Sequence, residues 1–224
     1  MSTISENLRV VEEGITSACV TAGRPRNSVQ LIAVSKTMSN ELIAEAITAG
    51  LIHFGENKVQ EITAKQPAFH GQIRWHLIGH LQSNKAKKAL PCCHLLHTLD
   101  SVELGRQVDR ISGELGIKTR ALLQVNISND DAKYGLSPED TAATLTELSN
   151  KHSQYLEIIG LMTIPVFEED LEKTRRHFAH LRELRDHLAV STGLPLPELS
   201  MGMSHDYQIA IEEGATLVRV GTSI

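Results

Sequence analysis

Short apolar runs alternate with helical segments along most of the chain, and this alternation constrains the fold more than any other feature. The runs have the length of strands, whereas the segments between them repeat apolar residues at the spacing of one helix face. This alternation predicts a parallel sheet, and eight such units in 224 residues predict an α/β fold, a single (β/α)8 TIM barrel. A doubly wound open sheet is the alternative. We assign the strands to residues 30–36, 51–55, 74–79, 95–99, 120–127, 156–163, 198–201 and 216–220.

One further helix precedes the eight units. Leu8, Val11 and Ile15 recur at helical spacing within residues 4–22, and Pro25 lies in the break that follows. We therefore expect one domain over residues 1–224, in which residues 1–27 form an N-terminal helix and linker and residues 28–224 form the barrel. This extra helix is expected to cover the bottom or a flank of the barrel.

Composition and charge exclude several functional classes. With 27 acidic and 22 basic residues, the chain lacks the basic footprint of a nucleic-acid-binding protein. No apolar run is long enough to span a membrane, and the first residues lack the layout of a signal peptide. The three cysteines, of which Cys92 and Cys93 are adjacent, do not form a disulfide framework, so we expect a cytoplasmic protein. His76 and His80 are four apart but lack the accompanying glutamate motif, so we expect no metal site.

Lys36 closes the first predicted strand, at the end where barrels of this kind place their active sites. An ammonium carried into a low-dielectric site loses hydration, which lowers its pKa and makes the amine a usable nucleophile toward a carbonyl. The alternative is a charged residue that ends a strand and reaches solvent.

Two turns near the C-terminus are suited to an anion. Met201–Ser204 leaves the seventh strand and opens a predicted helix over residues 204–213, and Gly221-Thr222 follows the eighth strand. Glycines let backbone N–H groups approach an anion, and barrels commonly hold phosphate after these strands; the alternative is simple turn glycines. With Lys36, the turns suggest a phosphorylated carbonyl compound, either pyridoxal 5′-phosphate (PLP) or a sugar-phosphate aldehyde.

Arg219 favours PLP over the sugar phosphate. It shares a strand face with Leu217 and Gly221. A guanidinium can only donate hydrogen bonds, so one placed against the pyridine nitrogen of PLP keeps that nitrogen unprotonated and the ring a weaker electron sink. Arg219 as a second phosphate ligand, or as an ion-pair partner in the barrel wall, is the alternative.

Six motifs together resemble one known family. The series closely resembles the pyridoxal phosphate homeostasis proteins, in the right order and over nearly the whole chain. Its members are Ile32–Lys36 (IAVSK), Phe54–Asn57 (FGEN) with Val59–Glu61 (VQE), Trp75–Lys85 (WHLIGHLQSNK), Gly160–Met162 (GLM), Leu199–Ser204 (LSMGMS) and Val218–Thr222 (VRVGT).

The resemblance implies a barrel similar to the N-terminal domain of alanine racemase, with PLP held as an internal aldimine on Lys36. It places the phosphate at Ser204, Gly221 and Thr222, the pyridine nitrogen at Arg219, and Asn57 on the same rim. It implies a role in vitamin B6 homeostasis: binding, buffering or delivering PLP, with PLP and apo PLP-dependent enzymes as partners. Family members usually continue past the glycine-threonine motif with a short basic tail, whereas this chain stops at Ile224.

Racemase chemistry on this fold needs a second base opposite the lysine, and we expect no catalytic residue of that kind here. Alanine racemases take a tyrosine from a second domain and a second subunit; this chain is expected to lack that domain and to be monomeric. Tyr134 on the rim and Tyr207 after Ser204 are the candidates, each with a structural role as the alternative. A PLP carrier is the first hypothesis, a racemase or lyase of the same fold the second, and a sugar-phosphate aldolase the third. His80 is expected to cap the following helix rather than to donate to the cofactor.

Overall fold

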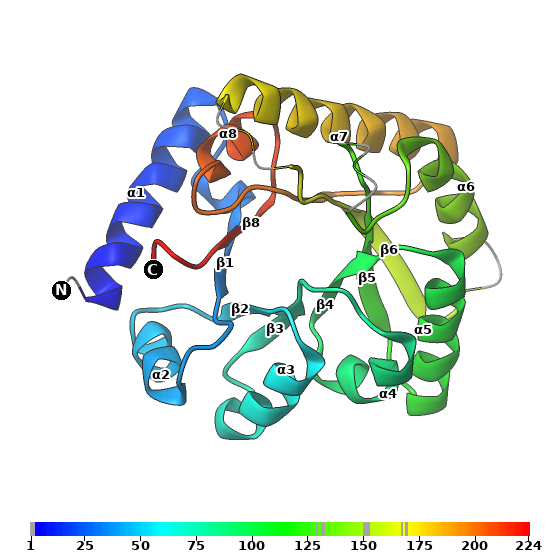
Figure 1. The fold of residues 1–224 in the computed structure, drawn as a ribbon, viewed down its shortest axis with the longest axis horizontal. Helices are drawn as coiled ribbons and strands as arrows, with labels where there is room; N and C mark the ends of the chain where they lie inside the picture. The colour runs from blue at the N-terminus through cyan, green and yellow to red at the C-terminus, as the bar shows by residue number, and fades with distance from the viewer. Residues whose placement is uncertain (1–2, 129, 131–132, 150–152, 167, 169) are drawn as a thin grey trace.

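Eight short strands pair in parallel, each with the next along the chain, and the eighth returns to the first to close a barrel (Figure 1). The computed structural model describes residues 3–128, 130, 133–149, 153–166, 168 and 170–224. The strands are β1 (Gln30–Val34), β2 (His53–Glu56), β3 (Arg74–Leu77), β4 (Leu95–Leu99), β5 (Thr119–Gln124), β6 (Leu156–Met162), β7 (Glu198–Ser200) and β8 (Leu217–Val220). The predicted (β/α)8 barrel is confirmed.

Helices form an outer ring around the strands, because each connection crosses back outside the sheet (Figure 1). Apolar side chains of the strands and helices fill the layer between them. A smaller apolar cluster, which includes Ile32, Leu122 and Met162, fills part of the barrel interior. The helices are α1 (Ile4–Thr21), α2 (Asn40–Thr48), α3 (Val59–Lys65), α4 (Ala86–Ala89), α5 (Val102–Leu115), α6 (Pro138–Ser149), α7 (Leu171–Thr192) and α8 (Tyr207–Glu212).

The extra helix α1 covers a flank of the barrel, not its bottom. It lies beside α8 and α2, with Val11 and Ile15 buried (Figure 1). Its first turn carries a capping box, in which Thr3 and Glu6 each bond the other's backbone N–H. Asn7 Nδ2 donates to the Ile224 carbonyl at 3.1 Å, which ties the last residue of the chain to this helix.

Several element boundaries differ from those predicted. Glu56 still belongs to β2, so the following helix begins at Val59. The sequence also predicts one helix over residues 82–90, but the structure has short 3-10 and α segments between Ser83 and Cys92 instead. Asp100 and Glu103 have the sequence spacing of a capping box. This prediction is wrong, because Ser101 Oγ accepts from the Leu104 N–H at 3.2 Å. Asp100 instead bonds a histidine of the rim, so a tertiary contact replaces the local cap.

Gly160 lies where β6 closely approaches β7. A Cβ at this position would lie 1.9 Å from the carbonyl oxygen of Glu198, the residue opposite it on β7. We expect Gly160→Ala to lower the free energy of unfolding by about 1–3 kcal/mol, because backbone must move to admit the methyl group. Urea denaturation would measure the loss. Gly113→Ala is the control, since its methyl would meet only the Tyr155 side chain; equal losses in both variants would contradict the explanation.

Candidate functional site

A cavity of about 320 Å³ opens at the C-terminal end of the barrel. All six residues that the sequence suggested for the cofactor line it: Lys36, Asn57, Ser204, Arg219, Gly221 and Thr222. They come from the ends of β1, β2 and β8 and from the turn after β7. Parallel strands bring their carboxyl ends to one edge, which is why residues so far apart in sequence share this cavity.

Lys36 lies two residues after Val34, the last residue of β1, and is exposed, so the predicted low-dielectric surroundings of its amine are not found. The turn after it has an unusual backbone, because Thr37 adopts φ 63°, which a β-branched residue rarely does. The Thr37 N–H donates to Glu61 Oε2 at 3.0 Å, which holds the turn in this conformation. The position of Lys36 on the rim is therefore set by the backbone around it.

Beneath this turn, the charged side chains of Glu56, Lys65 and Glu61 form a small ionic cluster. Glu56 is fully buried, and its Oε1 accepts from Lys65 Nζ at 2.7 Å and from Ser35 Oγ at 2.7 Å. Lys65 Nζ also donates to the Ser35 carbonyl at 2.8 Å and lies 3.6 Å from Glu61 Oε2. Burial raises the pKa of the Glu56 carboxyl, although its bonds to Lys65 and Ser35 oppose that rise. The cluster fixes β1 to α3 directly behind Lys36.

The anion-suited turns meet at one side of the cavity. The Gly221 N–H points at Ser204 Oγ, 3.3 Å away, so these two donors lie together. A Cβ on Gly221 would lie 3.1 Å from the Val34 side chain, so glycine keeps this side open. The helix predicted from Ser204 begins only at Tyr207, because residues 204–206 form a turn. An anion here would therefore be met by loop N–H groups and a hydroxyl, not by the first turn of a helix.

Arg219 forms part of the cavity floor and is only 3 % exposed. It donates to Ser200 Oγ at 2.5 Å and to the Thr163 carbonyl at 3.0 Å, both neutral acceptors. Burial lowers the pKa of Arg219 to about 10, while the charge of Asp206 opposes the change. The side chain therefore remains a cation and a pure donor at neutral pH. The alternative of an ion pair in the barrel wall is not found among the described residues.

A row of buried histidines continues from Arg219 through the barrel interior, and the sequence analysis missed it. Ser200 Oγ contacts His97 Nδ1 at 2.8 Å, His97 Nε2 contacts His76 Nδ1 at 2.9 Å, and His76 Nε2 contacts His53 Nδ1 at 2.8 Å. Burial lowers the pKa values of His76 and His97 well below the ordinary value. The sequence feature that could have predicted this row is one histidine on the inner face of each of three consecutive strands.

Other residues singled out in the sequence lie outside the cavity. His80 does not cap a helix; its Nδ1 contacts Asp100 Oδ2 at 2.9 Å and its ring stacks on Tyr134 with centroids 4.4 Å apart. Tyr207 packs against α1, where a Cβ on Gly14 would lie 2.1 Å from the Tyr207 hydroxyl. No described tyrosine lines the cavity, so these residues supply no second base there.

Comparison with known proteins assigns the chain to a family. The family model for the N-terminal domain of alanine racemase matches residues 4–224. The pyridoxal phosphate homeostasis protein of Aquifex aeolicus (strain VF5) is 41% identical over 221 residues, which cover 97% of this chain and 95% of the relative. The chain belongs to the pyridoxal phosphate homeostasis protein family. The resemblance seen in the motifs is thereby confirmed.

Two further proteins are similar to this chain over most of its length. The pyridoxal phosphate homeostasis protein of Homo sapiens is 38% identical over 231 residues, which cover 97% of this chain and 84% of the relative. PipY of Synechococcus elongatus PCC7942, solved with PLP bound, is 42% identical, with a TM-score of 0.83 over 93% of this chain and 98% of that one.

Within the described residues of the present chain, no helix is long and apolar enough to cross a bilayer.

Proposed function

We propose that this chain binds PLP covalently through the Lys36 amine and serves vitamin B6 homeostasis by buffering the cofactor or delivering it to apo PLP-dependent enzymes. The observation that supports it best is the single cavity that contains all six expected residues. PLP supplies an aldehyde that a primary amine captures, and Lys36 is the only lysine that lines this cavity in the described residues. The PLP-bound structure of PipY supports the same assignment.

The cavity fits the other parts of PLP as well. Ser204, Gly221 and Thr222 offer hydroxyl and N–H donors to the phosphate. Arg219 would donate to the pyridine nitrogen and keep it unprotonated, since its neutral partners leave its charge in place. Asn57 would contact the ring from the same rim. These assignments favour holding the cofactor over using it as a strong electron sink.

The enzyme alternative needs a second acid–base group, and the described lining offers only His205 besides Lys36 and Arg219 as a titratable residue. Incubation with amino acids in deuterated water would separate the two hypotheses. Steady α-proton exchange that is lost in Lys36→Ala would favour an enzyme, whereas absence of exchange would favour the carrier. We further propose a monomer that acts in the cytoplasm, consistent with three cysteines that form no disulfide.

The test of cofactor binding uses PLP and borohydride. We expect the wild-type protein to turn yellow with PLP, and reduction to fix the label on Lys36 in a peptide map. Lys36→Ala should lose both the absorbance and the label. Lys133→Ala is the matched control and should keep them, because Lys133 lines a different cavity. A colourless wild type, or an equal label in Lys36→Ala, would overturn the proposal.

Delivery is tested separately by mixing the holo-protein with an apo PLP enzyme in the presence of an agent that traps free PLP. Activation that survives the trap would support direct transfer. Activation abolished by the trap would restrict the role to buffering.

A further inference from the structure

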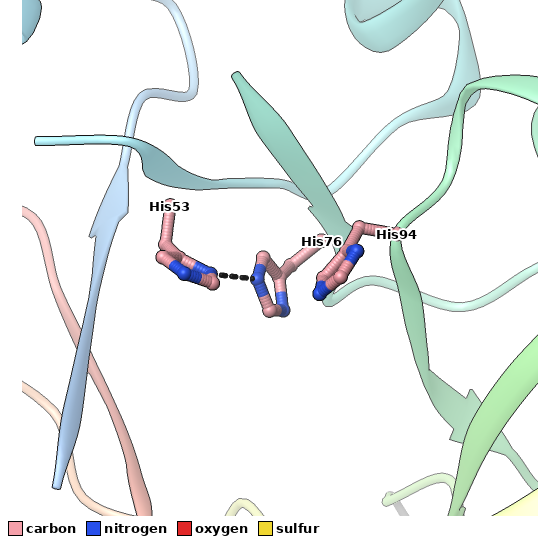
Figure 2. A group of neighbouring side chains, drawn as sticks. All are labelled: His53, His76 and His94. Carbon is pink, nitrogen blue, oxygen red and sulfur yellow. Dashed lines mark hydrogen bonds between the residues drawn. The ribbon is translucent and has the colours of Figure 1, made fainter. Parts of the chain in front are cut away.

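The side chains of three histidines lie close together (Figure 2). They lie near the N-terminal ends of the strands, whereas the cofactor cavity lies at the C-terminal ends. His53 is the first residue of β2, His76 lies on β3, and His94 immediately precedes β4, so three neighbouring strands each supply one ring. Their ring centroids lie 5.1, 5.5 and 5.8 Å apart. One nitrogen from each ring can be chosen so that all three lie within 4.8 Å of one another.

These rings are suited to bind a metal because three imidazole nitrogens, one from each of three neighbouring strand segments, already converge. Imidazole nitrogen is the commonest protein ligand for metals of the zinc class. The nitrogens must approach to about 3.3 Å apart for tetrahedral Zn–N bonds of about 2.0–2.1 Å. The 2.8 Å contact between His53 and His76 must lengthen slightly for this.

The surroundings already orient the central ligand. If His76 binds through Nε2, its proton resides on Nδ1, which then donates to His97 Nε2, 2.9 Å away. His97 is itself held by Ser200 at 2.8 Å. Histidine ligands of metals almost always donate their other N–H in this way, which fixes the ring and its tautomer.

The donor atoms of the cluster decide which cation it would take. The group consists of three imidazoles with no carboxylate among them. Imidazole suits metals of the zinc class, whereas calcium and magnesium need oxygen ligands. Arg74 on β3 and Arg120 on β5 add positive potential near the rings, which opposes dications of every kind. His94 is half-buried, whereas His53 and His76 are buried, so a fourth ligand from water would enter on the His94 side.

We propose that His53, His76 and His94 form a binding site for one divalent transition metal of the zinc class, with water as the fourth ligand. The site lies at the opposite end of the barrel from Lys36. Co²⁺ is the best probe, because its visible spectrum reports tetrahedral coordination and nitrogen ligation directly, while Zn²⁺ gives stoichiometry and affinity.

The experiment titrates the full chain with Co²⁺ and then displaces it with Zn²⁺. We expect one metal ion per chain and the intense visible bands of a tetrahedral site. Loss of second-shell partners weakens metal sites about 10- to 100-fold, so His94→Ala, which removes a direct ligand, should weaken binding at least tenfold. His94 is chosen because it is the least buried of the three ligands. Thermal unfolding of the His94→Ala variant in the absence of metal would verify that the variant is folded.

Two controls make the outcome decisive. His187→Ala, on the outer face of α7, should bind metal as the wild type does. Cys93→Ser should also bind normally, which excludes the thiol that precedes His94 in the chain as a ligand. Absence of stoichiometric binding, octahedral Co²⁺ spectra, or equal affinity in folded His94→Ala would overturn the proposal and leave the rings as a hydrogen-bonded part of the barrel core.

Discussion

Replacing Lys65 with methionine is expected to lower the free energy of unfolding by about 3–5 kcal/mol, which is the usual result of removing one partner of a buried ion pair. Lys65 Nζ lies 2.7 Å from Glu56 Oε1, and the side chains are 11% and 0% exposed. Methionine fills much of the same space but leaves the Glu56 carboxylate without its counter-charge. Urea denaturation of wild type and variant at neutral pH would measure the difference.

Two further variants identify the charge as the cause. Adding Glu56→Gln to Lys65→Met should recover part of the loss, because the buried group is then neutral. The deficit of Lys65→Met should also shrink in acid, since burial raises the pKa of Glu56 and the uncompensated carboxyl can protonate. Lys88→Met, at an exposed position, should leave stability nearly unchanged. A loss in Lys65→Met below that of Lys88→Met would refute the argument.

Acid is expected to destabilise the fold steeply, by about 3 kcal/mol as the pH falls from 6.5 to 5.5. The unfolded chain binds protons on His53, His76 and His97 around and below the ordinary histidine pKa of about 6.5. The folded chain does not, because burial lowers the pKa of His53 to about 4 and the pKa values of His76 and His97 well below the ordinary value. The unfolded state therefore gains protons first, so this stability is present above the unfolded pKa and is lost as the pH falls. Between pH 6.5 and 5.5 each of the three histidines contributes about 1 kcal/mol.

Denaturant unfolding at several pH values between 7.5 and 5.5, a range chosen around the histidine pKa of about 6.5, would measure this slope. His97→Gln should reduce the slope by about a third, since His53 and His76 still resist protonation. His187→Gln is the control, because this ring is exposed on α7 and should not change the slope. An identical slope in wild type and His97→Gln would show that the buried rings do not cause the acid sensitivity.

The barrel and its cavity could be predicted because they follow from local patterns. The alternation of strand and helix periods is written along the chain, and parallel pairing then carries the ends of β1, β2 and β8 to one edge. Lys36, Ser204 and Arg219 were recognisable by their places at these ends. Their meeting in one cavity required only the predicted order of the strands.

What could not be predicted depends on which tertiary partner a side chain finds. Asp100 was a plausible helix cap, but its carboxylate bonds His80, and the neighbouring Ser101 caps α5 instead. The interior row of histidines was missed because a buried ring is costly unless it is hydrogen-bonded, and its partners come from other strands. The exposure of Lys36 likewise follows from the Thr37 turn, which no local pattern indicated.

The histidine row between His53 and Ser200 has one more consequence, which concerns direction. A neutral imidazole has one donor and one acceptor nitrogen, and both nitrogens of His76 and of His97 are engaged. Each ring must therefore point its proton the same way as its neighbour, and the row has only two arrangements, each the reverse of the other. A ligand that fixes one proton at the His53 end selects the arrangement of the whole row, up to the hydroxyl that Arg219 contacts. The two ends of the barrel are thus connected by proton positions alone, without any movement of the backbone.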